Sequence, residues 1–175
     1  MTACYRPWTA VDAMLANLTH ALQAKGMWES TYIIFLGDNG GPSNNANSNT
    51  EFKGQKFGHW EGGHRVPCWI GGGALLPALR TRWYNETVHL VDLHRTILDL
   101  AGVSTSARPA GVLDADGFSL LPLLNGSSPL TSVLRPRNGE LWVFDDALRI
   151  GDYKLITGKG AAQTSTGGCS LLGLG

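Results

Sequence analysis

The sequence contains little charge and no excess of either sign. Only 16% of its 175 residues are charged, and 14 Lys and Arg balance 14 Asp and Glu. A nucleic-acid-binding protein needs a basic surface to neutralise phosphates, so we expect no nucleic-acid partner. No apolar run approaches the ~20 residues that a membrane-spanning helix requires, so no membrane span is expected.

Cysteine is also scarce, and the chain begins without a secretion signal. The three cysteines, Cys4, Cys68 and Cys169, lack the CxxC spacing of a metal site. Cys68 lies in the apolar stretch VPCWI and is predicted to be a core residue. The first residues, MTACYRPWTAVDAML, have neither the charged start nor the apolar centre of a signal peptide.

N-glycosylation sequons are nevertheless present, at Asn17, Asn85 and Asn125. Sequons at this density favour a protein of the secretory route, lysosomal or extracellular. Because this chain carries no signal peptide, we expect the full-length protein to begin upstream of Met1.

Hydrophobic periodicity predicts two helices. Apolar residues recur at helical spacing from about 9 to 25, where Gly26 ends the pattern, and again from 88 to 101. Asp92 and Asp99 lie seven positions apart on the second helix and are predicted to be exposed to solvent.

Apolar runs predict the strands between and after these helices. Tyr32–Leu36 is continuously apolar, which is typical of a strand covered on both faces in a parallel sheet, and RVPCWIGGG predicts a second buried strand. Later, ELWVFDD and ALRIGDYKLITG predict two strands that pair antiparallel. Helices alternating with buried strands indicate an α/β fold.

Polar residues follow the first predicted strand directly: Asp38, Asn39, Gly40 and Gly41. In open α/β sheets, ligands bind at the carboxyl ends of the strands. A carboxylate and a carboxamide supply hard oxygen donors, which suit Ca²⁺ or Mg²⁺. The alternative is a Gly-rich turn in which Asp or Asn bonds its own backbone, and the dipeptide alone favours that turn.

A second polar cluster, FKGQKFGHWEGGHRVP, combines basic side chains with glycine. Lys56 can hold an anion while the glycines let the backbone approach it, although the alternative is a solvated basic loop. His59 and His64 do not have HExxH spacing, which disfavours a zinc site, and they are candidates for lining a substrate pocket. Glu61 and Arg65 are predicted to brace the loop.

Together these motifs resemble the type I sulfatase family, in particular arylsulfatases and arylsulfatase B-like members. GDNGG followed by KFGHWEGGHRVP is similar to the family's strand end and its Lys-x-x-x-Trp/Tyr-Glu-Gly-Gly-x-Arg loop. VDLHRTILDLAGV, DGFSLLPLL and GDYKLI are similar to later landmarks of that family, in the same order. The resemblance extends over about 11–158.

The resemblance implies an α/β, alkaline-phosphatase-like fold: a partial sheet flanked by helices, with the start of a small antiparallel C-terminal subdomain. It assigns 1–135 to the C-terminal half of the catalytic domain, 136–158 to the start of that subdomain and 159–175 to a disordered tail. It also implies hydrolysis of a sulfated small molecule or glycan with Ca²⁺ and a formylglycine. Asp38 and Asn39 would be metal ligands, and Lys56 would contact the sulfate.

The chain also departs from the family pattern. It has no Cys/Ser-x-Pro-x-Arg motif for formylglycine, and it lacks the family's first metal carboxylates and upstream His and Lys. We therefore expect a fragment that is inactive alone. The alternative hypothesis is a catalytically inactive, sulfatase-derived protein or anion-binding module. A phosphoryl-transfer relative on the same fold is disfavoured by WEGGHRVP.

Overall fold

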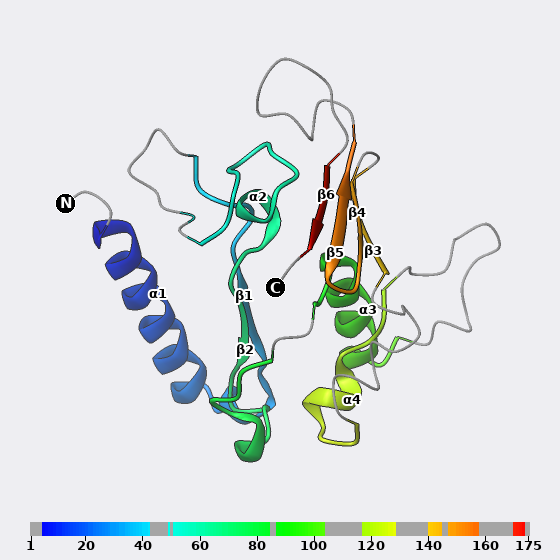
Figure 1. The fold of residues 1–175 in the computed structure, drawn as a ribbon. Helices are drawn as coiled ribbons and strands as arrows, with labels where there is room; N and C mark the ends of the chain where they lie inside the picture. The colour runs from blue at the N-terminus through cyan, green and yellow to red at the C-terminus, as the bar shows by residue number, and fades with distance from the viewer. Residues whose placement is uncertain are drawn as a thin grey trace.

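The computed structural model describes residues 5–42, 49, 51–84, 87–103, 117–128, 140–144, 147–157 and 170–173. Two sheets and several helices are arranged as Figure 1 shows. None of the helices in the described residues is both long and apolar enough to cross a membrane. The helices and strands, with 3-10 helices labelled η, are α1 (Tyr5–Ala24), η1 (Trp28–Ser30), β1 (Ile33–Leu36), α2 (Glu61–His64), β2 (Cys68–Gly71), η2 (Pro77–Leu79), α3 (Leu90–Leu100), α4 (Leu121–Leu124), β3 (Glu140–Phe144), β4 (Ala147–Ile150), β5 (Tyr153–Ile156) and β6 (Ser170–Gly173).

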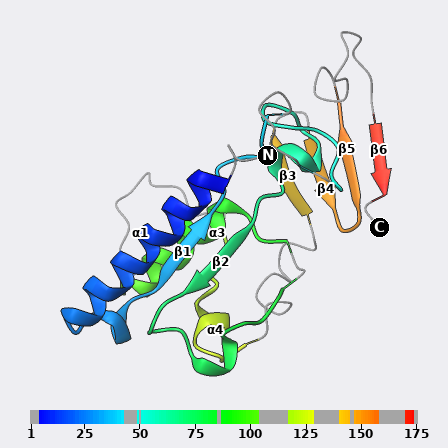
Figure 2. The same cartoon turned by 90° about the vertical axis from the view of Figure 1, so that its left-hand side faces the viewer.

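The first sheet consists of β1 and β2 and lies between helices. Figures 1 and 2 show α1 along one side of this sheet and α3 on the other side. Ile34 and Ile70 are partners across the two strands, and both pack against the buried side chains Leu93 and Leu120. Burial of these apolar groups fixes α3 and the segment before α4 against one face of the sheet.

The prediction of parallel strands buried on both faces is wrong for the described residues. β1 pairs antiparallel with β2, from Ile33 opposite Gly71 to Leu36 opposite Cys68. Leu36 is exposed, and so is Cys68, which the sequence had placed in the core. A continuous apolar run indicates that both faces can be covered, but it does not specify which strand lies alongside or in which direction.

α1 confirms the first predicted helix. It ends before Gly26, whose φ of +67° is the left-handed conformation that glycine adopts readily after a helix. Met14 and Leu18 remain 55% and 43% exposed, so only part of the apolar stripe is covered. The half-buried members of that stripe are Val11, Leu15 and Leu22.

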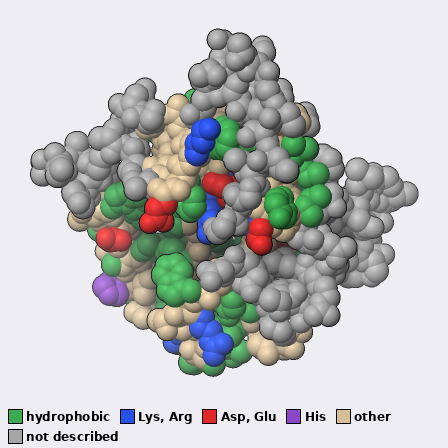
Figure 3. All heavy atoms as spheres, in the orientation of Figure 1, with side chains coloured by type: hydrophobic (Ala, Val, Ile, Leu, Met, Phe, Trp, Pro, Cys, Tyr) green, Lys and Arg blue, Asp and Glu red, His purple; other side chains and the backbone are tan. Residues whose placement is uncertain are grey.

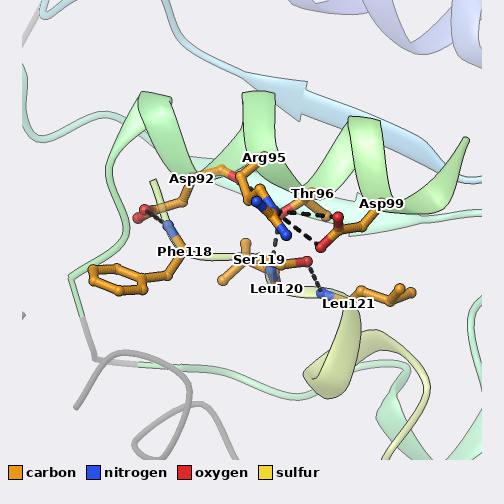
Figure 4. Close-up of polar contacts among 8 residues, drawn as sticks. All are labelled: Asp92, Arg95, Thr96, Asp99, Phe118, Ser119, Leu120 and Leu121. Atoms are coloured by element: carbon orange, nitrogen blue, oxygen red, sulfur yellow. Dashed lines mark hydrogen bonds and ion pairs between the residues drawn. The ribbon is translucent and has the colours of Figure 1, made fainter. Parts of the chain in front are cut away.

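α3 confirms the second predicted helix, but Asp92 is fully buried instead of exposed. Figure 4 shows the contacts between α3 and the segment before α4. One carboxylate oxygen of Asp92 accepts a hydrogen bond from the N–H of His89 at 2.8 Å, and the other accepts from the N–H of Phe118 at 2.8 Å. Thr96 Oγ1 donates to the Asp92 carbonyl at 2.6 Å and accepts from the N–H of Leu120 at 2.8 Å. Asp92 thus caps the helix and anchors a distant segment.

The second sheet contains β3, β4, β5 and β6 in sequential, antiparallel order. The predicted single strand ALRIGDYKLITG is instead a hairpin, because Gly151, with φ +56°, turns the chain between β4 and β5. β6 lies within the tail that the sequence predicts to be disordered. Asp145 and Asp146, at the predicted turn, lie outside the described residues.

Candidate functional site

Backbone hydrogen bonds fasten the segment after β1 to the loop that contains α2. The N–H of Gly40 donates to the carbonyl of Gly63 at 3.0 Å, and the N–H of Lys56 donates to the carbonyl of Gly41 at 3.5 Å. Within the loop, the N–H of Gly62 donates to the carbonyl of Lys53 at 2.8 Å. We call this set of bonds the backbone frame.

Glycine is required where these segments meet. A Cβ atom on Gly40 would overlap the carbonyl of Gly62, and one on Gly62 would overlap the carbonyl of Gly54. A Cβ on Gly63 would likewise overlap the carbonyl of Gly58. The glycines that the sequence marked for close backbone approach are therefore used to bring backbone to backbone.

Asn49 is a structural residue that the sequence analysis missed. Its side-chain oxygen accepts from the N–H of Gly41 at 2.9 Å, and its amide nitrogen donates to the carbonyls of Gly41 at 2.8 Å and Gly54 at 3.2 Å. One side chain thus satisfies three backbone groups in the two segments that the frame joins. The sequence offers no distinguishing signal, because Asn49 stands in a tract of similar residues, NNANSNT.

Asp38 and Asn39 follow β1 after one residue, Gly37. The N–H of Asn39 donates to Asp38 Oδ1 at 2.8 Å, and the Asn39 amide donates to the carbonyl of Gly40 at 3.0 Å. These are the local bonds of a turn, yet they leave Asp38 Oδ2 and Asn39 Oδ1 without hydrogen bonds to other described residues. Both oxygens are hard donors for a cation.

The pair cannot by itself complete a metal site. Within the described part of the chain, no group of three or more His, Cys, Asp and Glu is arranged to hold a metal ion. Ca²⁺ takes about six to eight oxygen ligands, so Asp38 and Asn39 supply a fraction of the set.

Each basic residue of the loop lies over an aromatic ring, an arrangement that stabilises a cation by cation–π attraction. Lys56 belongs to this group, and its ammonium is the candidate anion ligand. The pairs are Lys53 Nζ at 3.8 Å from the Trp60 ring centroid, Arg65 Cζ at 4.7 Å from that of Phe52, and Lys56 Nζ at 5.2 Å from that of Phe57.

Glu61 braces the loop, as predicted, and its partner comes from the second sheet. Lys154 on β5 is 1% exposed and donates to Glu61 Oε1 at 2.8 Å, across 93 positions of sequence. Arg149 on β4 lies 3.8 Å from the other carboxylate oxygen. The sequence shows no trace of this pairing, because long-range ion pairs leave no local periodicity.

The two histidines of the loop lie together, with ring centroids 5.8 Å apart. Burial lowers the pKa of His64 from 6.5 to about 4, and the neighbouring Lys154 and His59 add to the effect, while Glu61 opposes it. His64 is therefore neutral at pH 7. Their predicted role in lining a pocket stays a prediction.

The glycosylation candidates are distributed over the surface of the described part. Asn17 is exposed on α1, and Asn125 is exposed directly after α4. Asn85 lies outside the described residues.

Comparison with known proteins agrees with this arrangement. The sulfatase family model matches residues 2–103. Arylsulfatase J of Mus musculus is 26% identical over 171 residues, which cover 86% of this chain and 27% of the relative. The chain thus spans about a quarter of the length of that relative.

Solved structures show the same fold. The PsFucS1 sulfatase from Pseudoalteromonas sp. superposes with a TM-score of 0.68 at 26% identity, covering 95% of this chain and 33% of the other. Ps i-CgsB, solved in complex with k-i-k-neocarrahexaose, gives a TM-score of 0.67 at 22% identity, covering 93% and 34%. The fold is therefore the alkaline-phosphatase-like α/β fold, present in part. Since the family model matches more than half of its residues, the chain belongs to the sulfatase family.

Proposed function

We propose that this chain is the part of a sulfate-ester hydrolase that supplies some of the metal ligands and the lysine that binds sulfate. Asp38 and Asn39 would bind Ca²⁺, and Lys56 would contact a sulfate oxygen. The observation that carries the proposal is the backbone frame, in which Gly40 bonds to Gly63 and Lys56 bonds to Gly41. These two bonds hold the lysine's loop beside the strand end that carries the carboxylate.

The donor chemistry of the site fits this assignment. Asp38 Oδ2 and Asn39 Oδ1 are hard oxygens, and a bound Ca²⁺ would supply electrostatic polarisation of the sulfate. The Lys56 ammonium is a compact cation that can hold a sulfate oxygen by a charge-assisted hydrogen bond. The remaining ligands and the family's formylglycine would come from a segment outside this chain.

The substrate is proposed to be a sulfate ester of an aryl compound or a glycan. The name of the mouse relative supports an aryl ester, and the oligosaccharide bound to Ps i-CgsB supports a glycan. A second candidate, an anion-binding module without turnover, is favoured by the incomplete set of metal ligands in the described residues. Hydrolysis of 4-nitrophenyl sulfate by this chain alone would exclude the second candidate.

Calorimetric titration of the 175-residue chain with inorganic sulfate, with and without Ca²⁺, tests the site. We expect Lys56→Met to weaken sulfate binding about tenfold or more, because it removes a charge-assisted hydrogen bond. Lys25→Met removes an exposed lysine outside the loop and is the matched control. Asp38→Asn is expected to abolish the effect of Ca²⁺. Equal sulfate binding by Lys56→Met and Lys25→Met would contradict the assignment.

We also propose that the full-length protein follows the secretory route to a lysosomal or extracellular location. Two sequon asparagines, Asn17 and Asn125, are exposed in the folded chain and can carry glycans there. Expression in a secreting eukaryotic cell behind a signal peptide tests this, because Asn17→Gln and Asn125→Gln should each remove one glycan mass. Secretion of a chain without glycans would contradict it.

A further inference from the structure

Phe57 has an unusual backbone conformation and an unusual exposure. Its φ is +71°, in the left-handed region that bulky residues rarely adopt. Its side chain is 92% exposed, so packing of the ring does not compensate for the backbone strain. An aromatic residue that is both strained and exposed is a candidate for a functional role.

The strain arises from a tight turn whose position is fixed. The N–H of Gly58 donates to the carbonyl of Gln55 at 2.9 Å, which makes Phe57 the third residue of a four-residue turn. A positive φ at that position is normally provided by glycine. The turn lies directly against α2, because the carbonyl of Gly58 packs against Gly63 too closely for a Cβ atom.

The same turn carries Lys56 as its second residue. The Lys56 ammonium lies 5.2 Å from the centroid of the Phe57 ring, so a cation and an exposed ring are displayed together. The other cation–π rings of the loop are different, since Trp60 is 4% exposed and Phe52 is partly buried. Among these three rings, Phe57 is thus the one exposed to solvent beside Lys56, where a bound molecule could contact it.

We propose that Phe57 determines specificity by contacting the ring of a sulfate ester whose sulfate is held by Lys56. This inference rests on the proposed function of Lys56. An exposed phenyl face binds another flat ring, an aryl group or the C–H face of a sugar, by stacking and burial of apolar surface. A sulfate ester of a ringless alcohol offers no such contact.

The test compares three esters by calorimetry on the full 175-residue chain: methyl sulfate, 4-nitrophenyl sulfate and galactose 6-sulfate. We expect at least one ring-bearing ester to bind between about twofold and tenfold tighter than methyl sulfate, the range of an aromatic pair. Which of the two ring-bearing esters is preferred then identifies the ring as aryl or sugar.

Phe57→Gly is the decisive variant. It removes the ring and also relieves the positive φ, so we expect a Tm at or above that of the wild type, with the preference for ring-bearing esters reduced to about one. Phe57→Tyr should retain the preference. Trp83→Ala is the matched control, because Trp83 is 95% exposed and lies outside the loop, and it should leave the preference unchanged.

The possible failures are distinguishable. If wild type binds all three esters equally, or if Phe57→Gly retains the preference, the role of Phe57 is wrong while the sulfate site stands. If Lys56→Met binds methyl sulfate as tightly as wild type, the sulfate site is wrong, and the role of Phe57 falls with it.

Discussion

At the scale of single residues, the Glu61–Lys154 pair ties the candidate site to the second sheet. Its nitrogen and oxygen lie 2.8 Å apart, and Lys154 is almost fully buried. Beside it, Trp60 from the loop packs with Ala147 and Ile156 from the sheet. A buried ion pair contributes less than its attraction suggests, but removing Lys154 leaves the Glu61 carboxylate with only the more distant Arg149, at 3.8 Å, among the described residues.

Lys154→Met is therefore expected to lower the free energy of unfolding by about 3–5 kcal/mol. Lys154→Arg keeps the charge and should lower the free energy of unfolding by less. The double variant Glu61→Gln/Lys154→Met should recover part of the lost stability, because neither charge of the pair remains. Urea unfolding of the single and double variants provides the measurement. A cost for Lys154→Met no larger than that of the exposed control Lys25→Met would contradict the pairing.

The pKa of His64 reports the position of the Lys154 charge directly, which a measurement of global stability does not. Lys154 is one of the charges that hold the pKa of His64 at about 4, and Glu61 acts in the opposite direction. Removing the lysine leaves Glu61 to favour the imidazolium, so Lys154→Met should raise the pKa of His64. NMR titration of the His64 ring in the folded range would detect the shift, and His64→Gln assigns the signal.

At the scale of elements, α3 shows how a polar residue on a helix can be misread. The spacing of Asp92 and Asp99 is the same as that of any exposed pair seven positions apart. The structure separates them, because Asp92 caps the helix and accepts from Phe118, whereas Asp99 forms an i,i+4 pair with Arg95. The cap at the start of the helix and the contact with the segment before α4 distinguish these roles.

The different surroundings of Asp92 and Asp99 allow the same substitution to be compared at a buried and at a partly exposed position of α3. Asp92→Asn leaves one acceptor where two N–H groups need partners, so we expect it to cost about 1–3 kcal/mol of folding free energy. Asp99→Asn alters a partly exposed pair with Arg95 and should cost no more than about 0.5 kcal/mol. Thermal unfolding of both variants measures the difference, and equal costs would mean that the buried cap does not stabilise α3.

Sequence patterns predicted elements better than pairings. Both long helices were predicted because a 3.6-residue period is a local signal. The antiparallel partner of β1 was missed, because strand direction depends on contacts across the gap between 36 and 68. The β4–β5 hairpin was missed although Gly151 and Asp152 are turn residues and the apolar alternation changes phase there, from positions 148 and 150 to positions 153 and 155.

At the scale of the whole molecule, the order of motifs identified the family, and the structure showed how those motifs meet. Gly62 and Gly63 were interpreted as points of close approach and Gly40 as part of a turn, but the contacts of all three with distant carbonyls depend on the complete fold. Lys154 stayed hidden because its partner Glu61 lies 93 positions away, and Asn49 stayed hidden because its neighbours in the sequence are similar polar residues. The roles proposed for Asp38, Asn39 and Lys56 combine the motif match with the backbone frame that holds their two segments together.

Much apolar surface is left uncovered in the described part of the chain. Figure 3 shows apolar side chains reaching the surface among scattered charged ones on the face it presents. Leu36 and Trp69 on the first sheet are 38% and 41% exposed, and Met14 and Leu18 on α1 are also exposed. A two-stranded sheet is marginally stable by itself, so the β1–β2 sheet depends on the helices packed against it for its stability.

The backbone frame also bears on how such a site can diversify over generations of mutation. Its bonds join N–H and carbonyl groups, which every residue type except proline provides, and its close contacts demand only glycine at a few positions. A substitution of the exposed Phe57 side chain leaves these bonds intact. Natural variation or laboratory selection can therefore change which molecules the loop recognises while the backbone frame stays the same.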